Sequence, residues 1–311
     1  MTEATPPPDL PVPAPGGTAE LAGYPVARIG YGVMQLERPA VDRDAALAIL
    51  RQAAAAGINH LDTAQFYGHC NELIRAALAP YPDHLVLVSK VGAVRDETAR
   101  PPLVAAQQPA ELRAQVDANL ASLGTERLGV VNLRRVDGPV GIQAEGDQRV
   151  ELDDQLAELI TLRDQGKIGG IGLSYVSAGQ LRQALPAGIV CVQNAYSVLD
   201  RATEPVLDLC REHGIAWAPF FPLGSAGFAN FPKVTENPVV TALAAGLGAT
   251  PAQVGLAWLL AHYDQTLLIP GTASPAHLAE NIAAGDVKLP ADALRALDRL
   301  AVPATPAPSP E

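Results

Sequence analysis

The sequence is poor in basic residues, and no segment of it concentrates them. Its 311 residues include 22 Lys and Arg against 33 Asp and Glu, which gives a formal net charge of -11. Nucleic acids and anionic membrane surfaces are bound by basic faces, so neither class of partner fits this chain. A polar or small-molecule partner fits better.

Cysteine is also scarce, with only Cys70, Cys191 and Cys210. Three cysteines cannot build a disulfide framework and their spacing matches no metal site, so we expect reduced, mostly buried thiols and no bound metal. The N-terminus lacks a basic stretch followed by an apolar core, and no segment offers about 18 uninterrupted apolar residues. A cytoplasmic protein without membrane association is therefore expected.

The sequence does contain a regular alternation of short apolar runs with longer helical segments. Runs rich in Val, Ile and Leu predict strands at 29–35, 58–61, 85–89, 128–133, 170–174, 189–193, 215–219 and 267–270. Near-continuously apolar strands interleaved with helices predict a (β/α)8 TIM barrel, an α/β fold buried on both faces of its sheet. Local signals bound two of the helices, with Asp42 and Gly57 for one and Pro109 and Gly124 for the other.

Proline-rich ends flank this pattern. Residues 1–20 and 303–311 lack periodic apolar positions and are expected to be disordered tails. The intervening residues 21–302 show no break in composition. We therefore expect a single barrel domain over that range.

Polar residues stand where the apolar runs stop, which is where enzymes of this architecture place their sites. Asp62 ends one run, Tyr67 follows five residues later, and Lys90 ends the next run. A tyrosine with its ordinary pKa of about 10 donates a proton poorly near neutrality, but a neighbouring ammonium favours the phenolate. Asp62 would keep Lys90 charged. The alternative is a structural salt bridge at the barrel rim beside a packing tyrosine.

These segments together resemble a known family. LDTAQFYG followed by VSKVG closely resembles the aldo-keto reductases, and the resemblance extends over nearly the whole chain through LGTERLGVVNLRRVD, GKIGGIGLS, VCVQNAYS, PFFPLG and IPGTASPAHLAEN. It implies a barrel that reduces carbonyl compounds with NADPH. It also makes Tyr67 the proton donor and gives Asp62 and Lys90 the task of tuning it.

The main departure from the family pattern is at the end of the fourth strand. The family normally has a histidine there, and LGVVNLRRVD places Arg134 in that position. A fixed cation could favour the phenolate of Tyr67, orient the carbonyl oxygen of the substrate, or pair with an anionic group on it. The alternative is that Arg134 or Arg135 merely caps the strand in solvent.

The resemblance also implies a dinucleotide site. Ser174 and Gln193 are expected to hydrogen-bond the nicotinamide carboxamide, although Tyr175 replaces the usual asparagine, and Phe220 replaces the usual stacking tyrosine. The other implied contacts are Gly32, Val33 and Met34 in the first loop, Phe221, Leu223 and Gly224 around the pyrophosphate, Thr272 and His277 near the 2′-phosphate, Glu280 and Asn281 at the adenine, and Asp62 and Gly271 as further cofactor contacts.

The preference for NADPH is expected to be weaker than in the family at large. A phosphomonoester usually recruits Lys or Arg, and GTASPAHLAEN contains neither, so NADH is an alternative cofactor. The glycine-rich segments GKIGGIG and GYGVM do not complete the G-x-G-x-x-G fingerprint of a Rossmann fold.

The substrate is predicted to be a small carbonyl compound. VVNLR, PFFPLG and LLIPGT resemble a bacterial subgroup that includes pyridoxal reductases, whose substrate carries an ionisable ring hydroxyl near the aldehyde. Arg134 could pair with that oxygen. One alternative is a ketoreductase or dehydrogenase for a sugar or natural product, and another is a nicotinamide-binding sensor or subunit with weak catalysis. The sequence gives no signal for the oligomeric state.

Overall fold

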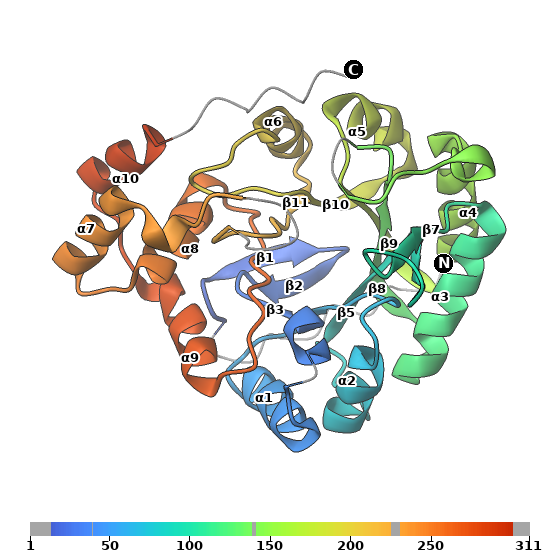
Figure 1. Cartoon of the computed structure of the whole chain (residues 1–311), viewed down its shortest axis with the longest axis horizontal. Helices are drawn as coiled ribbons and strands as arrows, with labels where there is room; N and C mark the ends of the chain where they lie inside the picture. The colour runs from blue at the N-terminus through green and yellow to red at the C-terminus, as the bar shows by residue number, and fades with distance from the viewer. Residues whose placement is uncertain (1–13, 39, 139–140, 225–230, 301–311) are drawn as a thin grey trace, which may run out of the picture.

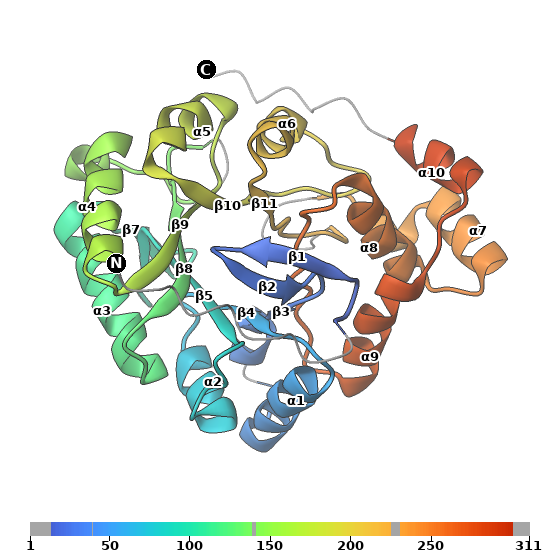
Figure 2. The ribbon, with the colours of Figure 1, turned by 180° about the vertical axis from the view of Figure 1, so that it is seen from behind.

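The structure, a computed structural model, describes residues 14–38, 40–138, 141–224 and 231–300. Within these ranges a ring of helices surrounds a curved parallel sheet (Figures 1 and 2). Strands that are neighbours in the sheet also follow one another along the chain, apart from a hairpin inserted after the third strand. These strands are β3 (Tyr31–Gly32), β4 (His60–Asp62), β5 (Val86–Val91), β8 (Leu128–Arg134), β9 (Ile168–Ser174), β10 (Ile189–Gln193) and β11 (Ala216–Trp217).

Two isolated bridges close the ring where the eighth strand is predicted. Thr266 pairs with Trp217, and Leu268 pairs with Ile29, both in parallel orientation. The segment 266–268 therefore lies between β11 and the residues that lead into β3. The (β/α)8 architecture is confirmed, although the predicted strand at 267–270 is present only as these bridges.

The first predicted strand, at 29–35, is partly wrong. After Gly32 the chain turns into the 3₁₀ helix η1 (Val33–Glu37). Val33 and Leu36 are both fully buried, and the spacing of three residues per turn is what brings them to the same face. A strand would have pointed these two side chains in opposite directions.

Two of the outer helices begin and end where their local signals predict. The side chain of Asp42 accepts hydrogen bonds from the backbone of Asp44 and Ala45, and Gly57 and Gly124 have φ values of 89° and 67°. Both glycines thus occupy the left-handed region that favours them. The helices are α1 (Arg43–Ala55), α2 (Cys70–Leu78), α3 (Pro109–Leu123), α4 (Leu152–Asp164), α5 (Ala178–Ala184), α6 (Glu204–His213), α7 (Pro238–Leu247), α8 (Pro251–His262), α9 (Pro275–Ala283) and α10 (Ala291–Asp298).

Two hairpins and several 3₁₀ turns lie outside the strands and helices of the barrel. An N-terminal hairpin is formed by β1 (Thr18–Leu21) and β2 (Tyr24–Ala27), and a second hairpin, β6 (Ala93–Arg95) with β7 (Leu103–Ala105), follows β5. The other 3₁₀ turns are η2 (Gly146–Gln148), η3 (Leu185–Ala187), η4 (Val234–Glu236) and η5 (Ala284–Asp286).

The first strand begins inside the range 1–20 that is predicted as a tail. Residues 18–20 belong to β1, where Ala19 is buried. A single buried strand of four residues is too short to give a periodic signal. The rest of that predicted tail up to residue 13, and the C-terminal tail 303–311, lie outside the described residues.

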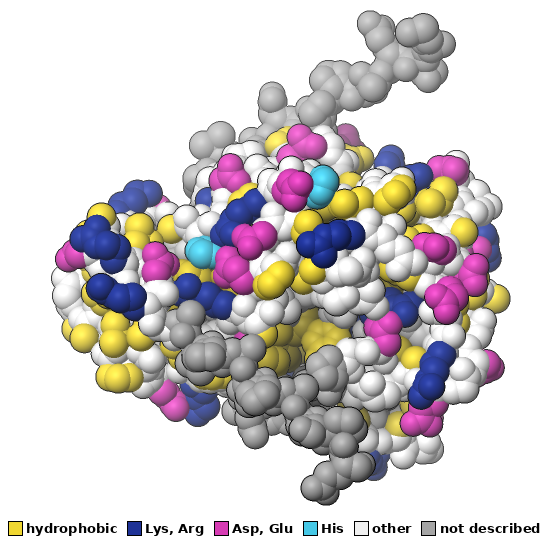
Figure 3. Space-filling model, turned by 90° about the horizontal axis from the view of Figure 1, so that it is seen from above, with side chains coloured by type: hydrophobic (Ala, Val, Ile, Leu, Met, Phe, Trp, Pro, Cys, Tyr) yellow, Lys and Arg dark blue, Asp and Glu magenta, His cyan; other side chains and the backbone are white. Residues whose placement is uncertain are grey.

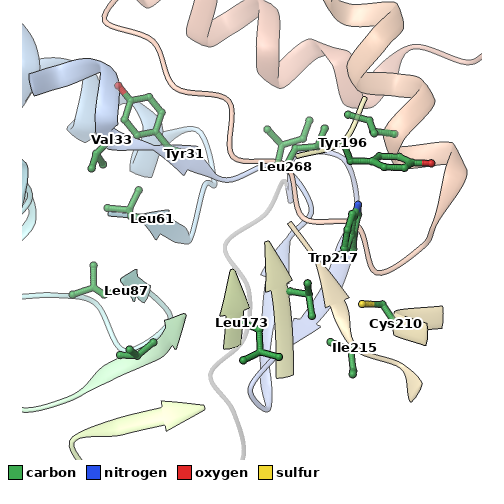
Figure 4. Close-up of a cluster of buried hydrophobic side chains, with 14 of the residues drawn as sticks. Tyr31, Val33, Leu61, Leu87, Leu173, Tyr196, Cys210, Ile215, Trp217 and Leu268 are labelled. Carbon is green, nitrogen blue, oxygen red and sulfur yellow. The ribbon is translucent and has the colours of Figure 1, made fainter. Parts of the chain in front are cut away.

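The sheet is buried on both faces because its residues alternate between two apolar clusters. The larger cluster lies between strands and helices and includes Leu61, Leu87 and Trp217 (Figure 4). A smaller cluster fills the barrel interior, where Val88 of β5 and Val130 of β8 belong to it. This double burial is what the near-continuous apolar runs predict.

The surface mixes charges of both signs. On the face in Figure 3, Lys and Arg side chains alternate with Asp and Glu rather than gathering into one patch. In the described part of the chain, no single helix is long and apolar enough to cross a membrane; α7 and α8 reach that length only together, and they are bent by 93° at the break between them.

Candidate active site

Five predicted site residues converge at the C-terminal rim of the barrel. In the pairing register Ser174 lies beside both Arg134 and Gln193. The ends of neighbouring parallel strands meet at one rim, so side chains there face a common mouth. The five residues, at or next to the ends of β4, β5, β8, β9 and β10, are Asp62, Lys90, Arg134, Ser174 and Gln193.

Asp62 and Lys90 form a buried ion pair at the floor of this mouth. The two side chains are 5% and 7% exposed and are joined by a short hydrogen bond from Lys90 Nζ to Asp62 Oδ1. Nζ also donates to the carbonyl of Thr63 at 3.1 Å, and the second oxygen of Asp62 accepts from Gln193 Nε2 at 2.6 Å. Burial alone would lower the pKa of Lys90, but the charge of Asp62, together with Tyr67, raises that pKa above its ordinary value. Lys90 therefore stays an ammonium.

Tyr67 lies over this pair, in the loop between β4 and α2. The Nζ atom of Lys90 is 5.1 Å from the centroid of its ring. The Tyr67 backbone N–H donates to the carbonyl of Ala64 at 3.0 Å, which fixes the turn. The ring of Phe66 meets it edge-on, with centroids 5.2 Å apart. The half-buried tyrosine is thus held next to a permanent cation.

Arg134 brings a second cation to the same place. Its guanidinium carbon is 5.8 Å from the centroid of the Phe66 ring, and its buried Nε has no hydrogen-bond partner among the described residues. Burial lowers the pKa of Arg134, while Tyr67 and Tyr175 nearby oppose that shift. A buried Nε–H left unpaired on this half-buried side chain is costly unless something binds it, so the guanidinium can serve as a ligand contact.

The neighbouring arginine has a different environment, and neither arginine caps its strand in open solvent. Arg135 is 8% exposed. It forms an ion pair with Asp137 and donates hydrogen bonds to the carbonyl of Val150 and to the side chain of Gln155. All of its partners lie on the outer side of the rim, so Arg135 is a structural residue.

The residues predicted to contact the nicotinamide lie together, and the rings of Tyr175 and Phe220 form a stacked pair beside them. Ser174 is buried, and Oε1 of Gln193 is buried without a hydrogen-bond partner in the described part. Tyr175 takes φ of 63°, a left-handed conformation that asparagine tolerates better than tyrosine. Its ring stacks on that of Phe220, with centroids 6.1 Å apart and planes 28° from parallel.

The predicted pyrophosphate loop is described up to Gly224. Phe221 has φ of 54° and its ring meets Phe220 edge-on at 5.3 Å. Leu223 accepts a backbone hydrogen bond from Val234 at 3.1 Å. Gly224 has φ of 87° and packs so closely on Pro232 that a side chain would clash. Residues 225–230, which continue this loop, lie outside the described ranges.

The first loop offers mostly backbone to a ligand. The backbones of Gly32 and Gly271 cross so closely that a Cβ on Gly271 would lie 2.5 Å from the carbonyl oxygen of Gly32. Val33 is fully buried in the outer core, so its side chain faces away from the mouth, which the sequence pattern does not reveal. Met34 is 40% exposed and remains accessible.

The predicted contacts for the adenosine end lie along α9 and in the segment just before it. Thr272 is buried, and its carbonyl accepts from the hydroxyl of Tyr31. His277 is exposed on the first turn of the helix, and Asn281 is buried one turn later. The carboxylate of Glu280 accepts from Thr250 Oγ1. The structure thus places the residues together and leaves their roles as predictions.

Phe66 is the site residue that sequence reasoning missed. Its ring contacts both the guanidinium of Arg134 and the ring of Tyr67. The available signal was the pair of adjacent aromatic residues, Phe66 and Tyr67, in the loop that follows the strand ending at Asp62.

Comparisons with known proteins agree with this geometry. The model of the aldo/keto reductase family matches residues 28–302. The chain belongs to this family. It is 45% identical over 289 residues to pyridoxine 4-dehydrogenase of Escherichia coli, covering 90% of this chain and 97% of the relative. It is also 30% identical over 292 residues to an uncharacterised oxidoreductase of Schizosaccharomyces pombe, covering 91% and 89%.

Solved structures of aldo-keto reductases share the fold. The reductase of Klebsiella pneumoniae in complex with NADP and acetate has a TM-score of 0.76 at 26% identity, covering 91% of this chain and 94% of that one. A thermostable aldo-keto reductase in complex with the inhibitor epalrestat gives 0.75 at 26% identity, covering 91% and 99%. This chain is therefore an aldo-keto reductase, an oxidoreductase.

Proposed function

We propose that this aldo-keto reductase reduces an aldehyde or ketone with NADPH, using Tyr67 as the proton donor. The observation that carries the proposal is the Lys90 ammonium, buried, paired with Asp62 and 5.1 Å from the ring centroid of Tyr67. Gln193, which donates to Asp62, and the carbonyl of Thr63, which accepts from Lys90, also fix the pair.

The described residues fit a nicotinamide cofactor. Oε1 of Gln193 is a buried acceptor without a partner among them, and it would accept from the carboxamide beside Ser174. When bound, NADPH supplies the hydride that adds to the carbonyl carbon. NADH is the alternative, because no Lys or Arg occurs in the segment GTASPAHLAEN. Titrating the protein with both cofactors and following fluorescence decides between them.

The residues of the chain handle the proton. The hydroxyl of Tyr67 protonates the oxygen on which negative charge develops, and the Lys90 ammonium stabilises the phenolate that remains. Asp62 keeps Lys90 charged and fixes its position. In the opposite direction the phenolate accepts the proton of an alcohol.

We propose pyridoxal as the substrate, with pyridoxine as the product. Two observations support this choice. A relative with 45% identity bears the name pyridoxine 4-dehydrogenase. The guanidinium of Arg134 also has an unpartnered Nε within the described residues, suited to the ionised ring hydroxyl next to the aldehyde.

Replacing Tyr67 with phenylalanine tests the proton donor. Tyr67→Phe is expected to lower kcat by about 100- to 10,000-fold because general acid catalysis is lost. NADPH should bind with unchanged affinity in a fluorescence titration. Tyr81→Phe is the matched control, because the hydroxyl of Tyr81 donates to the carbonyl of Leu123 at the end of α3, not to a residue of the site. Wild-type turnover in Tyr67→Phe would contradict the assignment.

Arg134 is tested by comparing two aldehydes. Arg134→His introduces the residue usual in the family, and we expect kcat/KM for pyridoxal to fall by about 10- to 100-fold because the charged pair is lost. Benzaldehyde carries no ring hydroxyl, so its kcat/KM should change far less. Arg113→Met, which breaks a partly buried ion pair between Arg113 on α3 and Glu158 on α4, is the control. Equal losses on both aldehydes would exclude pairing with the ring oxygen.

A further inference from the structure

The side chain of Gln107 joins the ends of two strands that carry site residues. It precedes α3 and is 1% exposed. Its Nε2 donates to the backbone carbonyl of Arg134 at 2.9 Å and, by a short hydrogen bond, to the carbonyl of Gly92. Gly92 comes two residues after Lys90. One amide group therefore ties together the strand ends that present the two cations of the site.

The two strand ends touch at Gly92. This residue has φ of 108°, and a Cβ added to it would overlap the carbonyl oxygen of Arg134. Its own N–H donates to Oε1 of Gln115 at 2.8 Å. Gly92 is thus held from both sides, and the amide of Gln107 completes the junction.

The orientation of the Gln107 amide is itself determined. Its Oε1 accepts from Nε2 of Gln155 at 2.8 Å. The side-chain oxygen of Gln155 in turn accepts from Arg135, which is paired with Asp137. A flipped amide on Gln107 would point its oxygen at two carbonyl oxygens and its NH₂ at another NH₂. Both polar atoms of the Gln107 amide are therefore paired, the nitrogen with two carbonyls and the oxygen with one amide.

We infer that Gln107 is a positioning residue that sets where Lys90 and Arg134 stand relative to Tyr67. It touches neither substrate nor cofactor and acts only through the two strand ends. The inference rests on the catalytic roles proposed for those residues. Small displacements of such groups slow the reaction strongly, because catalysis depends on the distance and direction of the proton donor and its neighbours.

Two substitutions separate the hydrogen bond from the shape of the side chain. In Gln107→Glu the shape is kept, but the second oxygen can donate to a carbonyl only while the carboxyl group is protonated. In Gln107→Met the donor is lost at every pH. We expect both to lower kcat by up to about a hundredfold. The loss in Gln107→Glu should grow as the pH rises, and the loss in Gln107→Met should not.

Asn59 provides a matched control at the opposite end of β4. It is fully buried, its Nδ2 donates to the carbonyls of Pro25 and His84 at 3.0 and 3.2 Å, and its Oδ1 accepts from the N–H of Ala27 at 2.8 Å. The hydrogen-bond pattern equals that of Gln107, away from the site. Asn59→Asp should therefore lower the stability of the protein and leave the pH profile of kcat as in the wild type.

Hydrogen exchange gives a readout that does not depend on turnover. Backbone amides at 91–93 and 133–136 should exchange faster in both Gln107 variants than in the wild type and in Asn59→Asp. The inference is overturned if Gln107→Met exchanges at these positions like the wild type, or if it keeps wild-type kcat. A wild-type protein that reduces no carbonyl compound would instead refute the proposed function, while the exchange rates would still decide whether Gln107 fixes the strand ends.

Discussion

His60 is a buried histidine inside the barrel, two residues before the site carboxylate of Asp62. It is 1% exposed, and neither ring nitrogen has a hydrogen-bond partner within the described ranges. The ring packs directly on Gly30, where a Cβ would overlap it. Burial lowers the pKa of His60 to about 4, although the backbones of Ala27 and Leu268 oppose the shift. The native protein therefore holds this imidazole neutral at pH 7.

This histidine should make the protein less stable in mild acid. In the unfolded chain His60 takes up a proton at its ordinary pKa of about 6.5, whereas in the folded protein it does so only near pH 4. The neutral His60 therefore contributes its full share of the free energy of unfolding above pH 6.5, and this share is lost as the pH falls toward 4. The total loss is about 3 kcal/mol. Urea unfolding at pH 7.5 and 5.0 measures most of it, about 2 kcal/mol, because pH 5.0 is still above the folded-state pKa. In His60→Leu the free energy of unfolding should depend less on pH. His213→Leu, at an exposed position on α6, is the control and should keep the pH dependence of the wild type. An unchanged pH dependence in His60→Leu would contradict the expectation.

The residues of the site were predictable to different degrees. Asp62, Lys90 and Arg134 follow apolar runs, and the topology of a barrel brings such positions together whatever the details of packing. The stacking of Tyr175 on Phe220 was not predictable, because it depends on a left-handed backbone conformation at Tyr175. Ring orientation is decided by neighbours that are distant in the sequence.

At the scale of elements, local signals predict helices better than strands. Helix α3 begins with Pro109 and ends at Gly124, as its sequence indicates, because caps act within one turn. The strand expected at 29–35 instead gave the two-residue β3 followed by η1, since burial of Val33 and Leu36 outweighed the local strand preference. Tertiary packing thus decided the element where the apolar run was ambiguous.

The network around Gln107 shows a further limit at this scale. Gln107 lies between β7 and α3, and Gln155 is on α4, yet their side chains meet at 2.8 Å. Glutamine in a loop or on a helix is ordinarily a surface residue, so neither position suggests burial. Only the register of β5 and β8 brings the carbonyls of Gly92 and Arg134 within reach of one amide.

For the whole molecule, the two ends of the barrel have separate tasks. The C-terminal mouth carries the site, and the hairpin β1–β2 covers the opposite end, across the centre of the ring in Figure 2. Leu21 and Val26 from the hairpin belong to the interior cluster with Val86 of β5. Gly170, near the start of β9, is so close to Ala22 that an added Cβ would lie 3.0 Å from the Cβ of that residue. The hairpin therefore completes the interior core.

Because the hairpin and the site lie at opposite ends of the barrel, shortening a buried side chain of the hairpin should lower stability without disturbing the site. Leu21 is 1% exposed, and Leu21→Ala is expected to reduce the free energy of unfolding by about 2–5 kcal/mol through lost burial and the cavity left behind. Urea unfolding measures this change. Glu20→Ala, at the exposed neighbouring position, is the control and should stay within about 0.5 kcal/mol of the wild type. The affinity for NADPH should be equal in all three proteins at a temperature where each is folded, and a weaker affinity in Leu21→Ala would show that the two ends are coupled.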